Sequence, residues 1–335
     1  MTRPEDIIGV PAPFWRLRRF PLDGALLLFD RDSGLNILCD GPETAHLRQR
    51  MPRVIQFGIT NRCNLACAFC SRDLTASSDW TLDSAFSILA DLSQAGLLEV
   101  AFGGGEPWAF PEFDRLALRL YNETPLAVNF TTNGLAMTRE KLRRLGRAYG
   151  QIRLSLYDDN NWPDKVKMLV EEGARFGVNY LVTPARLPQL EATVLELVAM
   201  ECRDVLLLSY NGANRSLHLS SVEASSLATR VALLARALNR KVQIKLDVCW
   251  GERMEAAPRL FQRDDCGAGK DFMVLTSDKK IMPCSFHHVA LEIETANDIL
   301  DVWNNRQNEL NIPARDPGCA RLVDYGLGFE LGGNT

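Results

Sequence analysis

The sequence lacks several features that would place it in common protein classes. Basic residues are not in excess: 38 Lys and Arg stand against 42 Asp and Glu, so the net charge of −4 gives no electrostatic footprint for nucleic acid. No run approaches the roughly 18 apolar residues that a membrane-spanning helix needs. The residues after Met1 contain no apolar stretch typical of a secretory signal, and there are no repeats or low-complexity tracts. We therefore expect a cytoplasmic globular protein without nucleic-acid or membrane partners.

What the chain does have is cysteine, in an uneven distribution. Nine cysteines in a reducing cytoplasm are not expected to form a disulfide framework. Clustering of cysteines in such a compartment favours metal binding instead. The two groups are Cys63, Cys67 and Cys70, within eight residues, and Cys266, Cys284 and Cys319, in the last quarter of the chain.

From residue 54 onward the sequence alternates between short runs rich in β-branched and aromatic residues and longer segments with apolar residues at helical spacing. Three of these segments, 81–96, 163–177 and 221–239, predict helices. Strand–helix alternation is typical of a parallel sheet, and six strands are too few to close an eight-stranded barrel. We therefore expect an α/β fold, a partial (β/α)6 barrel of the TIM type, with strands over 54–60, 98–102, 126–131, 152–156, 178–182 and 205–209.

The two ends of the chain differ from this pattern. Residues 24–40 are two apolar runs around a polar, Gly-containing turn, which predicts a hairpin. After a further strand at 241–249, the runs 272–275 and 280–284 flank a turn, and 296–307 resembles a short helix. We predict a preface at 1–50, the barrel at 51–249 and a small α+β extension at 250–335.

The first cysteine group lies on one tight loop after the first strand of the barrel, at the end where such barrels keep their active sites. A [4Fe–4S] cube takes four ligands, so three cysteines leave one iron open to a small molecule. Tetrahedral zinc is the alternative, but it requires four ligands, commonly two CxxC pairs. Buried structural thiols are a second alternative, and they have no reason to repeat at this spacing.

The CxxxCxxC spacing, with an aromatic residue before the third cysteine, resembles the signature of the radical S-adenosylmethionine (SAM) superfamily. A GGE-like segment closes the second strand, a TNG-like segment follows the third, and a serine lies on the fourth, in the order of that family. The resemblance implies a [4Fe–4S] cluster on Cys63, Cys67 and Cys70. The residues that it assigns to binding SAM are Phe69, Gly104, Gly105, Glu106, Asn133 and Ser155.

The same resemblance implies the chemistry. SAM chelates the open iron through its amino and carboxylate groups, and an electron from the cluster splits the sulfonium. The 5′-deoxyadenosyl radical then takes a hydrogen atom from the substrate. The electron would come from a flavodoxin or ferredoxin. The sequence does not identify a catalytic acid or base; Tyr157, Asp158 and Tyr210 follow strand ends and are candidates for lining the pocket.

The extension resembles the SPASM/Twitch domains of this superfamily, in its shorter form with one auxiliary Fe–S cluster, expected to be [4Fe–4S]. Cys266, Cys284 and Cys319 would be three of its ligands. The familiar closing CxxC pair is missing, because Leu322 stands where its second cysteine would be. Two interpretations remain: either Cys249 supplies the fourth thiolate, or one iron is open or bound by one of three other side chains, namely His287, His288 or Asp324.

Members with such extensions mostly modify ribosomally made peptides, by cross-linking, thioether formation or related oxidation. We therefore expect a peptide substrate, with radical dehydrogenation of an aminoglycoside-like small molecule as the alternative. The preface is short for a complete peptide-recognition domain of three helices and three strands, so a separate leader-peptide-binding protein is expected. A non-catalytic Fe–S electron carrier is the alternative of another class, and it would leave the GGE-like and TNG-like segments without a purpose.

Overall fold

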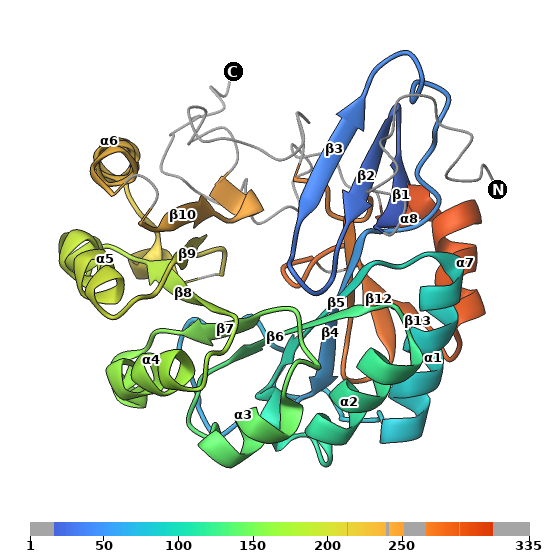
Figure 1. Ribbon diagram of the computed structural model, residues 1–335, viewed down its shortest axis with the longest axis horizontal. Helices are drawn as coiled ribbons and strands as arrows, with labels where there is room; N and C mark the ends of the chain where they lie inside the picture. Colours follow the sequence, from blue (N-terminus) through green and yellow to red (C-terminus); the bar gives the residue numbers. More distant parts are fainter. Residues whose placement is uncertain (1–16, 213, 239–240, 251–265, 288, 311–335) are drawn as a thin grey trace, which may run out of the picture.

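The alternating segments fold into one curved, mostly parallel sheet with helices along its outer side (Figure 1). The computed structural model describes residues 17–212, 214–238, 241–250, 266–287 and 289–310. In these residues the six predicted strands are present, and the further strand predicted at 241–249 follows them in a shorter form. They are β4 (Val54–Thr60), β5 (Glu99–Gly104), β6 (Ala127–Thr132), β7 (Ile152–Ser155), β8 (Phe176–Val182), β9 (Asp204–Ser209) and β10 (Gln243–Leu246).

The helices between these strands bury one face against the sheet, and three of them, α1, α3 and α6, begin at a side-chain cap. In α1 (Leu82–Ala95) the Thr81 hydroxyl accepts the N–H of Ser84, and the helix stops at Gly96, whose φ of 120° disfavours other residues. The remaining helices are α2 (Phe113–Glu123), α3 (Arg139–Leu145), α4 (Trp162–Glu171), α5 (Leu190–Ala199) and α6 (Ser221–Ala237).

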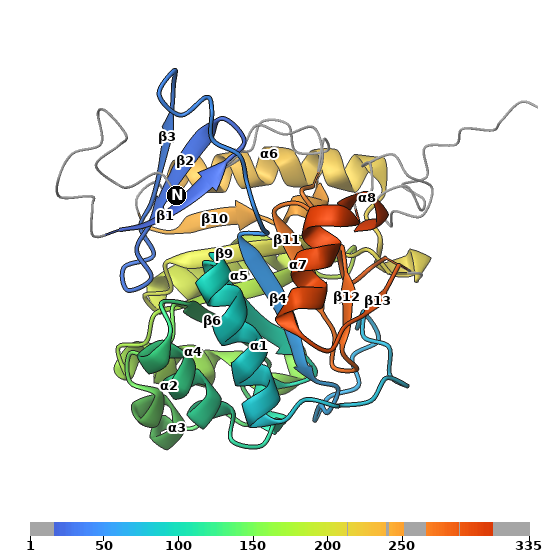
Figure 2. The same ribbon diagram turned by 90° about the vertical axis from the view of Figure 1, so that its right-hand side faces the viewer.

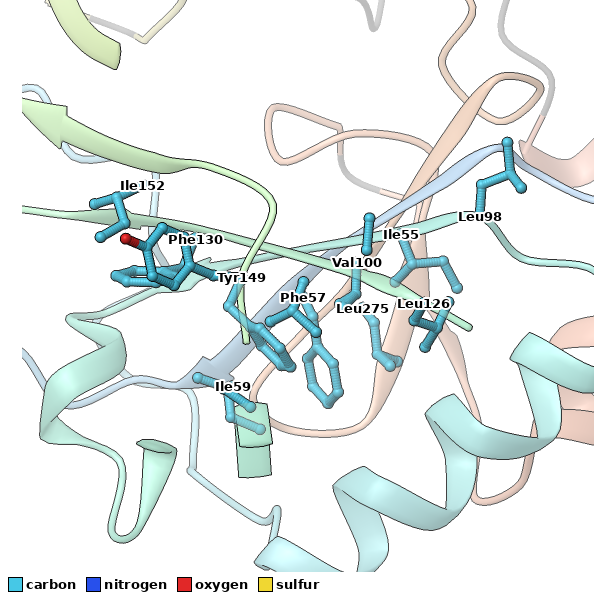
Figure 3. Close-up of a cluster of buried hydrophobic side chains, with 14 of the residues drawn as sticks. Ile55, Phe57, Ile59, Leu98, Val100, Leu126, Phe130, Tyr149, Ile152 and Leu275 are labelled. Carbon is cyan, nitrogen blue, oxygen red and sulfur yellow. The ribbon is translucent and has the colours of Figure 1, made fainter. Parts of the chain in front are cut away.

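The core lies between the sheet and these helices. Ile55, Phe57 and Ile59 alternate along β4 and are fully buried, as are Val100 of β5 and Phe130 of β6. Figure 3 shows these side chains gathered in one cluster beside the helices. The opposite, inner side of the strands carries small and polar residues, which leaves room for a site at the mouth of the barrel.

The sheet order is β10-β9-β8-β7-β6-β5-β4-β11-β12-β13, with β10 and β13 at its edges. The partial (β/α)6 barrel is therefore confirmed as an open sheet within the described residues. The segment 163–177 is shorter than predicted as a helix: α4 ends at Glu171, Gly173 takes a left-handed turn at φ 62°, and Gly177 already lies in β8. No helix among the described residues has both the length and the apolar character that crossing a bilayer demands.

The C-terminal extension continues the main sheet. β11 (Phe272–Leu275) lies parallel to β4, and β12 (Lys280–Met282) and β13 (Leu291–Glu292) follow antiparallel. The predicted hairpin turn is present, with Lys279 at φ 58°. α7 (Ala296–Asn305) packs beside α1 (Figure 2), and α8 (Gln307–Leu310) follows it.

The preface forms a small antiparallel sheet of three strands. The predicted hairpin is β2 (Ala25–Phe29) with β3 (Asn36–Asp40), and β1 (Arg18–Leu22) adds a strand that the sequence did not predict. This sheet lies against the amino ends of the barrel strands. There Arg18 donates to the carbonyl of Leu97, just before β5, at 2.9 Å. The small sheet therefore covers the end of the barrel opposite the cysteine loop. The domain boundaries at 50 and 249 stay a prediction.

Candidate active site

A cavity of about 390 Å³ opens at the carboxyl ends of the barrel strands. Parallel strands bring their carboxyl ends to one edge, so residues distant in sequence meet there. Every residue that the resemblance assigned to the first cluster or to SAM lines this cavity. They are Cys63, Cys67, Phe69, Cys70, Gly104, Gly105, Glu106, Asn133 and Ser155.

The three thiols of the loop lie close to one another. The N–H of Cys70 donates to the carbonyl of Cys67 at 3.1 Å, which fixes a tight turn. Burial, and then the neighbouring Cys70 and Cys63, raises the pKa of the Cys67 thiol. The described residues hold no group of three His, Cys, Asp or Glu arranged around a single metal ion. In a cubane each thiolate binds a different iron, so three cysteines on one loop are the donor set that a [4Fe–4S] cluster with one open iron requires.

Phe69 and Tyr157 form one wall of the cavity. Their ring centroids are 5.3 Å apart, so the loop packs on the residue that follows β7. Burial raises the pKa of Tyr157 to about 12, with the three cysteines adding to the shift. Of the three candidates beyond strand ends, Tyr157 and Tyr210 line this cavity, and Asp158 is not among its lining residues.

Two glycines bring β5 into contact with the end of β4. Gly104 has φ 89°, and a Cβ there would stand 2.7 Å from the Cα of Gly58. A Cβ on Gly105 would stand 2.0 Å from the carbonyl oxygen of Arg62, while the Gly105 N–H donates to the carbonyl of Thr60 at 2.7 Å. The glycines are thus required for the backbone approach that places the cysteine loop over the sheet.

Glu106 ties the GGE-like segment to the end of β6. Its side chain accepts the hydroxyl of Thr132 at 2.7 Å, the N–H of Asn133 at 2.8 Å and the N–H of Trp108 at 3.3 Å. Only 2% of Glu106 is exposed, and burial raises the pKa of its carboxyl despite these three donors. In this arrangement the carboxylate positions the neighbouring segment as well as bordering the cavity.

We expect Glu106→Gln to destabilise the fold by about 1–3 kcal/mol, because an amide nitrogen would face backbone donors that now have an acceptor. The raised pKa means that the folded chain binds this proton more tightly than the unfolded chain does. The free energy of unfolding of the wild type should therefore fall as the pH rises from the pKa of Glu106 in the unfolded chain through its higher pKa in the folded chain. The variant, which has no carboxyl there, should lose this dependence. Urea unfolding at several pH values measures both effects. Glu123→Gln is the control, since its pair with Arg119 is exposed; equal midpoints for the two variants would contradict the prediction.

Asn133 joins the TNG-like segment to the cysteine loop. Its Nδ2 donates to Asn64 Oδ1 at 2.7 Å and lies 3.9 Å from Cys63 Sγ. Asn160, which is fully buried, donates to the carbonyls of Asn133 and Ser155, both at 2.7 Å. Asn160 was missed from the sequence, because an asparagine in a loop gives no signal until the strand ends that it bridges are known.

The far wall of the cavity is polar. Besides Tyr210 it contains three residues that the sequence did not predict: Ser209 at the end of β9, Asn211 after it, and Asp247 after β10. Asp247 accepts the N–H of Ser209 at 2.8 Å and that of Cys249 at 3.0 Å, and burial raises its pKa to about 6. A buried carboxyl beside a cavity is a functional signal, but only the fold brings it there.

The extension closes the cavity from the other side. Ser285 and Phe286, directly after Cys284, are lining residues. A second cavity of about 630 Å³ adjoins the first and lies between the cysteine loop and the β11–β12 hairpin; both cavities share Cys70 and Arg72. Cys249, Cys266 and Cys284 are half-buried, whereas Cys319, His288 and Asp324 fall outside the described residues.

The comparisons with known proteins agree with this site. Residues 57–161 match the model of the Radical SAM superfamily. The PqqA peptide cyclase of Gluconobacter oxydans is 24% identical over 279 residues, covering 73% of this chain and 75% of the relative. That of Bradyrhizobium diazoefficiens is 32% identical over 101 residues, covering 29% of this chain and 26% of the relative.

A solved structure, Streptococcus suis SuiB bound to precursor peptide SuiA, has a TM-score of 0.67 at 18% identity, covering 82% of this chain and 71% of that one. At this identity the likeness supports the fold alone. The matched residues include the cysteine motif and the ends of β5, β6 and β7 that follow it. The chain therefore contains a radical SAM domain at residues 57–161.

Proposed function

We propose that this enzyme oxidatively modifies a ribosomally made peptide. The observation that carries the proposal is the meeting of three thiols, a glycine-rich strand end and a polar far wall around one cavity. The named relatives support a peptide as substrate, because they are peptide cyclases, and so does a structural neighbour that holds a precursor peptide. The bond formed in the product is left open by this proposal.

The residues of this chain would divide the work as follows. Cys63, Cys67 and Cys70 would hold three irons of a [4Fe–4S] cube. When bound, the cluster and SAM together supply a 5′-deoxyadenosyl radical that takes a hydrogen atom from the substrate. The backbone at Gly104 and Gly105 gives the cofactor a place against the sheet. Phe69 and Tyr157 restrict water beside the cysteine loop.

An auxiliary cluster in the extension would suit an oxidation, because it can accept the electron left on the product radical. Cys249 and Cys284 each lie within two residues of a lining residue, Asp247 and Ser285 respectively, so a cluster on them would adjoin the cavity. We assign it to Cys266, Cys284, Cys319 and Cys249. His287 fits less well, since its Nδ1 accepts the N–H of Val289 at 3.0 Å, whereas a histidine bound to metal ordinarily donates from its other nitrogen.

We also retain two partners, a flavodoxin or ferredoxin as reductant and a separate leader-peptide-binding protein. Residues 17–50, which contain three strands and no helix, are given no role in peptide recognition by this proposal.

The test is an anaerobic reaction of the reconstituted enzyme with SAM and dithionite. We expect 5′-deoxyadenosine to form, and we expect its yield to rise when a precursor peptide chosen from short reading frames beside the gene is added. Mass spectrometry of the peptide should show a loss of hydrogens. Formation of 5′-deoxyadenosine that rises with an aminoglycoside but not with the peptide would instead support the small-molecule alternative.

A further inference from the structure

An arginine contacts a thiol of the cysteine loop. The Nε–H of Arg72 donates to Cys70 Sγ at 3.4 Å. Arg72 also lines both adjoining cavities. Because the third cysteine and the arginine are two residues apart, the contact is local, but its geometry depends on the fold around it.

The guanidinium is held by the barrel and not by the sulfur. Its Nη1 donates to the backbone carbonyl of Asn61 and, at 3.3 Å, to Asn61 Oδ1. Asn61 directly follows β4, and its Nδ2 donates to the carbonyls of Asp73 at 2.9 Å and Ala76 at 2.7 Å. Asn61 at the end of β4 therefore holds both the guanidinium of Arg72 and the backbone that follows it. These contacts orient Nε towards Cys70 independently of the sulfur.

The positive charge of Arg72 is not neutralised by an ion pair within the described residues. The acid beside it, Asp73, accepts the N–H and hydroxyl of Thr75 at 2.8 and 2.6 Å. The charge also reaches a second thiol, because Arg72 acts to lower the pKa of Cys67 against the stronger effect of burial. The charge of the guanidinium therefore acts on two of the three cysteines and on the cluster that the three would bind.

We propose that Arg72 is a positioning residue that raises the reduction potential of the cluster on Cys63, Cys67 and Cys70. The inference rests on the proposed function, because it requires that cluster. One-electron reduction adds a negative charge to a core already bound by thiolates, so a nearby cation favours the reduced form. An N–H donor to a ligating sulfur acts in the same direction, and it is stronger when the donor is charged.

The experiment is a redox titration of the full chain, reconstituted anaerobically and monitored by electron paramagnetic resonance. The signal that changes on adding SAM identifies the cluster concerned. We expect Arg72→Gln to reduce the equilibrium constant for one-electron reduction about tenfold, a midpoint lower by about 59 mV. Arg72→Lys retains the charge but not the planar Nε donor, so its midpoint potential should lie between those of the wild type and Arg72→Gln.

The matched control is Arg62→Gln, which removes a charge from the same loop at an exposed side chain. It should leave the midpoint within error. An unchanged midpoint in Arg72→Gln, or an equal shift in the control, overturns the proposal. If Arg72→Gln does not retain the cluster, Arg72→Lys decides: a midpoint below wild type supports the role, and an unchanged one refutes it. A wild-type chain without a SAM-responsive signal contradicts the proposed function and this role together.

Discussion

Cys67→Ala is expected to reduce formation of 5′-deoxyadenosine to the level of a protein-free reaction. With one thiolate removed, two cysteines cannot hold a cube in which one iron is already left to SAM. Iron in the reconstituted protein should fall by about four atoms per chain, the content of one cluster. Iron and sulfide analysis, with product measured by chromatography under dithionite, checks both parts.

Cys39→Ala is the matched control for this loss. Cys39 is a half-buried thiol on β3, in the sheet at the opposite end of the barrel from the loop. It should retain full iron and full activity. A Cys67→Ala protein that keeps its iron and still cleaves SAM would refute the assignment of the loop to the cluster.

Gly105→Ala should disrupt the site through the backbone. The new Cβ would lie 2.0 Å from the Arg62 carbonyl oxygen, which is backbone and cannot turn aside as a side chain does. Either the cysteine loop or the end of β5 must move, so we expect a loss of about 3 kcal/mol in the free energy of unfolding. SAM binding, measured by calorimetry, should be lost at the same time.

Gly103→Ala provides the comparison, because a Cβ there meets nothing within 4 Å. Its free energy of unfolding, from urea titration, should stay within about 1 kcal/mol of wild type. Equal stabilities for the two variants would show that the contact between Gly105 and the loop does not hold this end of the barrel together.

The sequence was sufficient to predict the strands of the barrel and the cavity residues that belong to short motifs. The periodicity of β4 to β9 comes from alternate burial along each strand, which a single sequence displays directly. The cysteine spacing and the glycines before Glu106 are equally local. Their meeting at one edge follows from the parallel sheet alone.

What the sequence could not predict depends on contacts between distant segments. Asn160 and Asp247 acquire their roles only because β6, β7, β9 and β10 end side by side. β1 was missed because Pro21 interrupts its pattern, yet it pairs along its whole length with β2. The ligands of the auxiliary cluster stay a prediction for the same reason, since they come from segments on both sides of 251–265.

The pairing of β11 with β4 limits how a substrate reaches the chamber. These strands share a register from Phe272 with Val54 to Leu275 with Phe57, inside the same sheet that carries the cysteine loop. Swinging the extension outward would break this ladder of backbone hydrogen bonds, so the pairing opposes a hinge between barrel and extension. Substrate entry would instead depend on the loops at the rim of the cavity. An extended peptide could pass between these loops while the barrel and the extension stay paired.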